Sequence, residues 1–286
     1  MTPQDRIKAL PIWKGPVQAE PLRGGITNLN FVVQDADKKA VVRCGDDIPV
    51  HQILRSLELS ASRAAHLAGV SPAVLYHETG ILVIEFIEGK TLTAADMRQS
   101  TLLEQAVTLI KRAHQTIPHH LRGPAQMFWP FHVIRNYAAT LREGQSLHQD
   151  HLPSLLRQAE KLERTIGPID LIFGHNDLLA ANFLHDGDRL WLIDWDYAGF
   201  NSPLFDLGGL AANNDLNVDQ EAYVLERYFG NVDPDLWSRY RAMKAAAALR
   251  ETLWSMVSEL HSTLDFDFAS YTRTNLAAYQ TAYENL

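Results

Sequence analysis

The spacing of apolar residues changes once along the chain, and this change restricts the folds that the chain can adopt. From about Val17 to Ile87, short apolar runs are separated by turn residues, as in antiparallel strands, and one helical pattern interrupts them at about 51–67. Beyond Gly89 the apolar residues recur every three or four positions almost throughout. The sequence therefore predicts an α+β fold of two lobes, with a small antiparallel β lobe containing one helix and a larger, mostly helical lobe.

The change of pattern coincides with a polar segment. The sequence EGKTLT, which contains Gly89, favours a hinge because glycine and small polar residues interrupt regular structure. We therefore divide the chain into an N-terminal unit, residues 1–88, and a C-terminal unit, residues 89–286. The chain has 286 residues, 46% of them hydrophobic, so it is long enough to bury a large core.

Charge and cysteine content narrow the classes of partner. The formal net charge is −8 and no run of Lys or Arg forms a stripe, which argues against nucleic acid and favours a cationic or neutral small molecule. Cys44 is the single cysteine, so no intrachain disulfide is expected and a cytoplasmic location is favoured. No apolar run approaches the roughly 20 residues of a membrane span. The oligomeric state is not predicted.

One segment concentrates polar residues within an apolar frame: FGHNDLLAANFLHDGDRLWLIDWDYAG, residues 173–199. Within it, His175, Asp177 and Asn182 have the spacing His-x-Asp-Leu-x-x-x-Asn of the protein-kinase catalytic loop. In such loops the aspartate accepts the proton of the attacking hydroxyl. Asp177 is therefore the predicted catalytic base, and His175 is expected to brace the loop.

The same segment predicts a metal site. Asp186-Gly187 is a strong hairpin signal, and a hairpin there would return the chain so that Asp194 lies near Asn182. Amide and carboxylate oxygens are ligands that Mg²⁺ prefers. We predict that Asn182 and Asp194 hold Mg²⁺, and this explains why so many carboxylates occur beside strand-forming residues.

A phosphate site is predicted in the β lobe. Gly24 and Gly25 lie between two predicted strands, where their backbone could approach phosphate oxygens, although a plain tight turn explains them as well. Arg43, in AVVRCG, is placed where protein kinases have a phosphate-binding lysine, and Glu58 on the predicted helix can orient it. The alternative for Arg43 is an exposed strand arginine.

The end of the last predicted strand of the β lobe, LVIEFIEG, lies at the hinge. An adenine ring placed there would meet backbone groups of Glu85 and Ile87. Glu85 can equally be a carboxylate that simply ends the strand, and both interpretations are open.

These motifs together resemble a known family. GGITN, HNDLLAANFL, LIDWDYAGFN, FDLG and LWSMVSELHSTLDFDFASY are similar to motifs of the choline/ethanolamine kinases, within the wider group of aminoglycoside phosphotransferases and protein kinases. The resemblance implies a bilobal protein-kinase-like fold, ATP and Mg²⁺ as cofactors, and nucleotide contacts from Gly24, Gly25, Thr27 and Asn28. It also implies that Asp206 is a buried structural aspartate beneath the catalytic loop.

Two positions depart from the family pattern. Asp196, which we predict as a further metal ligand, stands where the family commonly has a glutamate. Eukaryotic members place two tryptophans about one helical turn apart in the acceptor pocket, whereas this chain has Glu251 and Trp254. A carboxylate beside an indole suits an ammonium group. The alternative is a core tryptophan beside an exposed glutamate.

The sequence thus predicts an ATP-dependent kinase that phosphorylates the hydroxyl of choline or a similar amino alcohol such as ethanolamine. The same fold would serve an aminoglycoside or thiamine phosphotransferase. A catalytically silent, kinase-like nucleotide-binding protein is the alternative from a different class.

Overall fold

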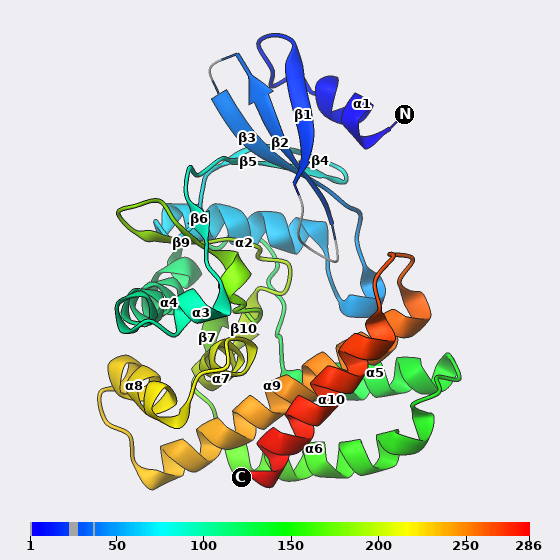
Figure 1. Cartoon of the computed structure of the whole chain (residues 1–286), viewed down its shortest axis with the longest axis vertical. Helices are drawn as coiled ribbons and strands as arrows, with labels where there is room; N and C mark the ends of the chain where they lie inside the picture. Colours follow the sequence, from blue (N-terminus) through cyan, green and yellow to red (C-terminus); the bar gives the residue numbers. More distant parts are fainter. Residues whose placement is uncertain (1, 23–27, 37) are drawn as a thin grey trace.

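The computed structural model describes residues 2–22, 28–36 and 38–286. The predicted nucleotide contacts Gly24, Gly25 and Thr27 lie outside the described residues, so they remain predictions. Figure 1 shows a β part at one end of the molecule and a larger helical part at the other. This arrangement confirms the predicted fold class.

The β part is a five-stranded antiparallel sheet in the order β1-β2-β3-β5-β4. Its strands are β1 (Val17–Leu22), β2 (Leu29–Asp35), β3 (Lys38–Cys44), β4 (Val74–Glu78) and β5 (Ile81–Glu85). Alternation along the strands gives the sheet two faces. One face buries a small apolar cluster that includes Phe31, Val33 and Val42, and helix α1 (Pro3–Lys8) adds Ile7 to it. The other face is left to line a cleft.

The predicted helix at 51–67 forms, but it begins later than expected. Helix α2 spans Arg55–Leu67, preceded by a separate 3-10 turn, η1 (Pro49–His51). Gln52 has a φ of 60° and Leu54 is extended, so neither continues a helix. Leu54, just before the first turn of α2, is 39% exposed.

Helix α2 packs its apolar face away from the small cluster. Ala61, Ala64 and Ala65 belong to the large core of the helical part, where α2 contacts α4 (Ser100–His120). The sheet ends at Glu85, and β6 (Lys90–Thr91) already pairs with β8 (Phe183–His185) of the other part. The change of architecture therefore falls near the predicted hinge. The division at residue 88 stays a prediction, because α2 contributes to the core of the helical part.

The helical part is built around one long helix, α9 (Pro234–His261), which packs against helices before and after it in the chain. Figure 1 shows α9 crossing this part beside α10. The other helices are α3 (Ala94–Met97), α4 (Ser100–His120), α5 (Pro130–Glu143), η2 (Gln149–His151), α6 (Leu152–Ile166), α7 (Pro203–Asn213), α8 (Val218–Phe229) and α10 (Phe268–Glu284). Among the described residues, no helix is long and apolar enough to span a bilayer.

Short strands interrupt the helices where the sequence signals them. They are β7 (Ile172–Gly174), β8 (Phe183–His185), β9 (Leu190–Leu192) and β10 (Gly199–Asn201), with a 3-10 turn, η3 (Ala180–Asn182), before β8. Strands β8 and β9 form the hairpin predicted at Asp186-Gly187. Strand β7 pairs with β10, so the two ends of the polar segment meet.

Close packing of α7 on α9 gives a stability prediction. A Cβ at Gly208 would lie 2.9 Å from Lys244 Cα, whereas a Cβ at Gly209 would meet nothing within 4 Å. We expect Gly208→Ala to lower the free energy of unfolding by about 1–3 kcal/mol, since the helices must separate. Gly209→Ala, the matched control, should raise it by up to about 1 kcal/mol through helix propensity. Urea denaturation measures both, and equal stability of the two variants would contradict this packing.

Candidate active site

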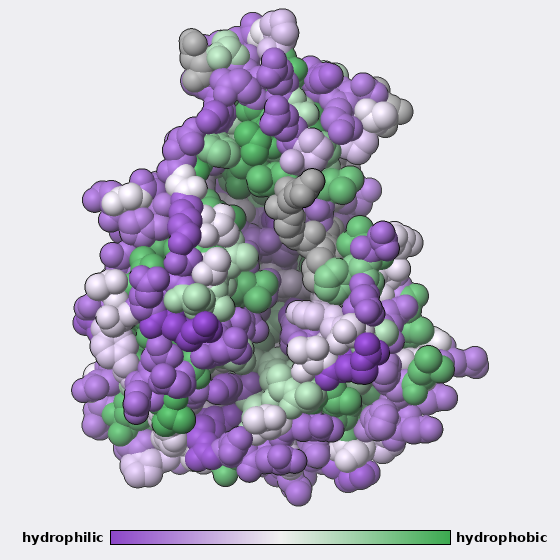
Figure 2. Space-filling view, viewed as in Figure 1, coloured by the Kyte–Doolittle hydropathy of each residue, from purple (hydrophilic) through white to green (hydrophobic). Residues whose placement is uncertain are grey.

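A cavity of about 260 Å³ separates the sheet from the helical part. Val41, Arg43 and Ile84 line it from the open face of the sheet, and Ile193 and Asp194 line it from the hairpin side. Figure 2 shows a hollow between the two parts, with apolar and polar residues both at its margin. Apolar walls with a few polar groups are typical of a small-molecule site.

The predicted adenine region lines this cavity at the hinge. Glu85, Phe86, Ile87 and Gly89 all contribute to its wall. The N–H of Glu85 donates to the carbonyl of Ala73 at 2.8 Å, and the Glu85 carboxylate accepts from the Ala73 N–H at 3.3 Å. Glu85 therefore also secures the end of its strand, and its contact with adenine remains a prediction.

Arg43 connects the sheet to the floor of the cleft. It lies at the end of β3, where alternation points it into the cavity beside Val41. Its guanidinium pairs with Glu58 of α2, with Asp194 at 2.5 Å, and with Asp196 at 3.0 Å. The structure thus joins the predicted arginine and glutamate, and it excludes the alternative of an exposed strand arginine because the side chain is only 11% exposed.

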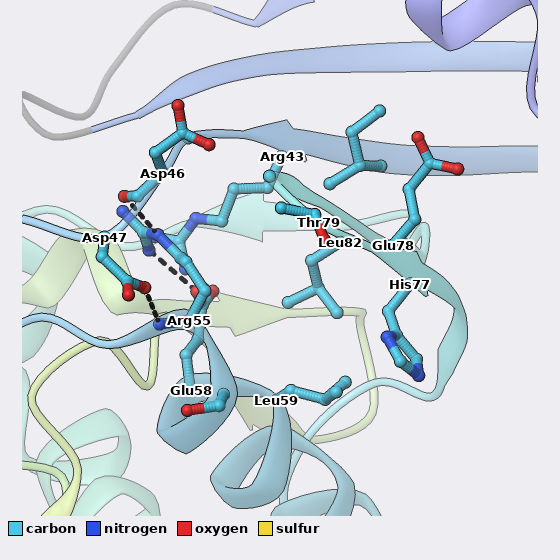
Figure 3. Close-up of a pocket in the computed structure, with 14 residues that line it drawn as sticks. Arg43, Asp46, Asp47, Arg55, Glu58, Leu59, His77, Glu78, Thr79 and Leu82 are labelled. Atoms are coloured by element: carbon cyan, nitrogen blue, oxygen red, sulfur yellow. Dashed lines mark hydrogen bonds and ion pairs between the residues drawn. The ribbon is translucent and has the colours of Figure 1, made fainter.

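A second arginine, which the sequence reading missed, joins this cluster. Arg55, the first residue of α2, donates to Glu58 and to Asp196, each at 2.8 Å. It also donates to the side-chain oxygen of Asn28 at 2.6 Å. Figure 3 shows Arg43 and Arg55 approaching each other from β3 and α2. The usable signal was the spacing of Arg55 and Glu58, which lie three apart on one helix face.

The catalytic loop is anchored from below by Asp206 of α7. Its carboxylate accepts from the N–H groups of His175 (2.8 Å) and Asn176 (2.7 Å) and from His114 Nε2 (2.8 Å). Burial alone would raise the pKa of Asp206, but the hydrogen bond and charge of His114 hold this pKa below its usual value. Asp206 is 2% exposed, so the predicted buried, hydrogen-bonded aspartate is confirmed.

His175 braces the loop from the other side. Its Nε2 donates to the carbonyl of Ile193 at 2.8 Å, and its Nδ1 accepts the N–H of Asp177 at 3.3 Å. Burial lowers the pKa of His175, which favours the neutral ring that this pair of bonds requires. Both ring nitrogens are hydrogen-bonded to backbone groups, so we propose that His175 braces the loop.

Asp177 follows directly and lines a small cavity together with Glu251. In the described part of the chain, no hydrogen-bond donor contacts its carboxylate oxygens. Burial, followed by the nearby charge of Glu251, raises the pKa of Asp177 to about 8, and the charge of Arg250 only partly opposes this. A carboxyl group with an unsaturated hydrogen-bonding capacity and a raised pKa is suited to exchange a proton with a ligand.

Asn182 and Asp194 meet beside Asp177 because of the hairpin. Ile193 donates its N–H to the Asn182 carbonyl at 2.9 Å, and Asn182 Nδ2 donates to the carbonyl of Asp177 at 2.8 Å. This bond leaves Asn182 Oδ1 as an acceptor. Asp194 has a φ of 71°, which is a costly backbone conformation for any residue other than glycine. Such conformations are concentrated at functional sites.

The donor set of these two residues fits Mg²⁺. Asp194 is 29% exposed and pairs through one oxygen with Arg43, whose charge lowers the Asp194 pKa against the effect of burial. In the described residues, no group of three or more His, Cys, Asp or Glu side chains is arranged to hold a metal. Mg²⁺ suits such a partial site, because it usually keeps water and phosphate oxygens as its remaining ligands.

Asp196 differs from Asp194 in its surroundings. Its side chain is 3% exposed, and both of its oxygens accept hydrogen bonds, Oδ1 from Arg43 and Arg55 and Oδ2 from Asn28 at 3.1 Å. Burial raises the pKa of Asp196, so its charge depends on the two guanidinium groups. Asn28, predicted to contact nucleotide, is tied to this cluster.

The predicted acceptor residues lie on α9. Glu251 accepts from the hydroxyl of Tyr271 at 2.8 Å and from Arg250 at 2.9 Å, and it lines a small cavity together with Asp177. Trp254 is 4% exposed, and its ring packs edge-on against Tyr271. The expected neighbourhood of carboxylate and indole is therefore present, with Tyr271 joining them.

Trp254 is more deeply packed than an open cation site requires. Its Nε1 donates to the hydroxyl of Tyr197 at 2.8 Å, and His51 stacks on its ring at a centroid distance of 5.0 Å. The alternative of a core tryptophan thus describes most of its contacts. Its role toward an acceptor remains a prediction.

Comparison with known proteins decides the family. The sequence pattern described as choline/ethanolamine kinase matches residues 19–225. The chain belongs to the choline/ethanolamine kinase family. It is therefore a phosphotransferase with an alcohol group as acceptor, and the family implies ATP as the phosphoryl donor.

Individual relatives are distant. The chain is 26% identical to protein LicA of Haemophilus influenzae, over 92% of this chain and 79% of LicA. It is also 26% identical to ethanolamine kinase 2 of Mus musculus, over 91% of this chain and 75% of that enzyme.

Solved structures share the fold. A choline/ethanolamine kinase family protein from Mesorhizobium loti is 28% identical, with a TM-score of 0.79 over 98% of this chain and 93% of that one. A LicA complex with AMP reaches 0.75 at 23% identity, over 97% of this chain and 96% of that one. Spectinomycin phosphotransferase, in complex with ADP and spectinomycin, has a TM-score of 0.63 at 18% identity, over 100% of this chain and 99% of that one. The last of these shares the fold with this chain.

The raised pKa of Asp177 predicts a pH-dependent stability. Between about pH 4, the ordinary pKa of aspartate, and pH 8 the folded protein binds the extra proton, so its free energy of unfolding falls as the pH rises. Asp177→Asn removes this loss. We expect the variant to be more stable than the original by about 1–2 kcal/mol at pH 8 and by less at pH 5, since partial exposure moderates the effect.

Chemical denaturation of the protein without nucleotide or metal measures this difference. Asp188→Asn, at an exposed position of the β8–β9 turn, is the control and should show no such trend. The measured quantity is the free energy of unfolding of Asp177→Asn minus that of the original protein. If this difference were smaller at pH 8 than at pH 5, it would contradict the environment described for Asp177.

Proposed function

We propose that the protein is an ATP-dependent kinase that transfers the γ-phosphoryl group to the hydroxyl of choline or a close amino alcohol such as ethanolamine. One observation carries this proposal: Asn182 is hydrogen-bonded to the backbone of Asp177 and of Ile193, the neighbour of Asp194, and Asp194 lines the cleft and pairs with Arg43 of the sheet. A base, two oxygen ligands for a cation and a phosphate-binding cation are the parts that phosphoryl transfer needs.

The nucleotide would occupy the cavity between the two parts. Its adenine would lie at Glu85 and Ile87, and its phosphates would reach Arg43, which Glu58 holds in place. Gly24, Gly25, Thr27 and Asn28 are proposed to contribute from the segment before β2. Mg²⁺ held by Asn182 and Asp194 would supply charge stabilisation at the phosphates.

Asp177 is proposed to orient the acceptor hydroxyl and to accept its proton. In the free protein its raised pKa keeps the carboxyl protonated near neutral pH. An added positive charge next to it lowers such a pKa, so binding of a cationic acceptor favours the ionised, basic form. The proton then passes from the hydroxyl to the Asp177 carboxylate as the oxygen attacks phosphorus.

The surroundings of Asp177 support a cationic acceptor. Glu251 adds a second carboxylate, and Tyr271 lies against both Glu251 and Trp254. Carboxylates and aromatic rings both attract an ammonium group. We propose that Glu251 and Trp254 contribute to acceptor binding, with Glu251 taking the place of the second tryptophan of eukaryotic members.

An intracellular setting agrees with this activity. The reaction requires ATP, and Cys44 is a free, partly buried thiol. A reducing compartment with ATP, such as the cytoplasm, is therefore our proposal for its location.

A panel of acceptors tests the function. Purified protein with ATP and Mg²⁺ is assayed for ADP release with choline, ethanolamine, thiamine and an aminoglycoside. We expect choline or ethanolamine to exceed the other two in kcat/KM by at least about tenfold, because one desolvated ammonium contact contributes roughly 1–2 kcal/mol. A preference for thiamine or the aminoglycoside would refute the amino-alcohol proposal.

The Asp177→Ala variant is measured in the same panel. It should lose about 10²–10⁴-fold in kcat while retaining ADP binding, since only proton transfer and orientation are removed. Asp188→Ala, on the exposed turn, is the control. Unchanged turnover of Asp177→Ala would rule out Asp177 as the base.

A further inference from the structure

The two acidic residues of the sequence IDWD have unequal access to a metal ion. Asp194 is 29% exposed and bonds through one oxygen, whereas Asp196 is 3% exposed and bonds through both. We propose that Asp196 is not a metal ligand, and that Arg55 supplies a fixed positive charge there in place of a second metal ion. The inference rests on the proposed use of a metal nucleotide.

The hydrogen bonds of Asp196 leave little room for a cation. Its Oδ1 accepts from Arg43 at 3.0 Å and from Arg55 at 2.8 Å, and its Oδ2 accepts from Asn28 Nδ2 at 3.1 Å. A metal ion would have to displace these donors from a carboxylate that is already shielded from water. Displacement would also remove one carboxylate partner from each of two buried guanidinium groups, which is costly.

Arg55 is held so that it cannot withdraw from Asp196. Its Nε donates to the carbonyl of Asp46 at 3.0 Å, and its other nitrogens reach Glu58 at 2.8 Å and Asn28 at 2.6 Å. Figure 3 shows Arg55 extending from α2 toward Asp46 and Arg43. With partners on three separate segments, its charge is a permanent part of the site.

The charges of the cluster support one metal ion. Arg43 and Arg55 carry two positive charges against the three carboxylates of Glu58, Asp194 and Asp196. A single divalent ion at Asp194 changes this sum from −1 to +1, so the cluster then attracts the nucleotide phosphates. A second divalent ion placed at Asp196 would lie beside two guanidinium groups, where repulsion opposes its binding.

The surroundings of each carboxylate agree with this role. Asp196 is enclosed by Arg43 and Arg55, whereas Asp194 lines the cavity between the two parts. We therefore regard Asp196 as a positioning residue that holds Arg43 and Arg55.

Counting bound metal ions tests this assignment. Mn²⁺ is titrated into the full-length protein with saturating ADP, and free Mn²⁺ is followed by electron paramagnetic resonance. We expect one ion per chain. Asp194→Asn should weaken Mn²⁺ binding by more than about 100-fold, whereas Asp196→Asn should change the dissociation constant by less than about threefold.

Variants of Arg55 distinguish its charge from its packing. Arg55→Gln, which removes the charge at Asp196, should allow a second, weaker Mn²⁺ to bind, while Arg55→Lys should keep one. Arg63→Gln, on the exposed face of the same helix, is the control and should also keep one.

The outcomes separate this inference from the proposed function. Two ions in the original protein, or equal losses in the two aspartate variants, would overturn the role assigned to Asp196. The number of Mn²⁺ ions bound by the original protein is measured without any variant. A variant that fails to fold therefore leaves this test intact. Absence of any ADP-dependent Mn²⁺ uptake would instead overturn the proposed kinase function.

Discussion

The ion pair between Arg43 and Asp194 is the interaction on which the rest of the site depends, because it joins the sheet to the catalytic segment across the cleft. Each partner is fixed by its own element. Arg43 ends a sheet strand, and Asp194 follows a hairpin whose register returns it to Asn182. Together with Asp196, Arg55 and Glu58, the pair forms a buried charge cluster in which each charge compensates another. The guanidinium groups of Arg43 and Arg55 thus stabilise the buried carboxylates of this cluster.

The catalytic loop is rigid for a related reason. Asp206 and His175 satisfy its backbone and side-chain groups from two sides, so the loop needs no contact with ligand to hold its shape. Among the described residues, no donor contacts the carboxylate oxygens of Asp177, and burial together with the charge of Glu251 raises its pKa. If Asp177 is the base, as we propose, such a preorganised frame would need no reorganisation during the reaction.

Much of this arrangement could be predicted from the sequence, because local rules determine it. Period two in the first part and period 3.6 in the second gave the fold class, and the Asp186-Gly187 turn located Asp194 beside Asn182. The contacts of Arg55 with Asn28 and Asp196 could not be predicted, since they join α2 to segments that are far apart in the chain. The sequence predicted a helix from about residue 51, but α2 begins at Arg55. The spacing of apolar residues carries no information about the left-handed backbone conformation of Gln52. Trp254 shows the same limit: the spacing placed it near Glu251, but its packing under His51 comes from a distant turn.

The central claim is that Asp177, Asn182 and Asp194 surround one divalent cation and the terminal phosphates of the nucleotide. A crystal structure of the protein with Mn²⁺ and ADP, with the metal located by its anomalous scattering, tests this claim most directly. The account predicts one metal peak within bonding distance of Asn182 Oδ1 and Asp194, with the Arg43 guanidinium on a phosphate and the Asp177 carboxylate facing the open acceptor side. A metal bound elsewhere, or a nucleotide that leaves the Asp194 carboxylate paired only with Arg43, would contradict it.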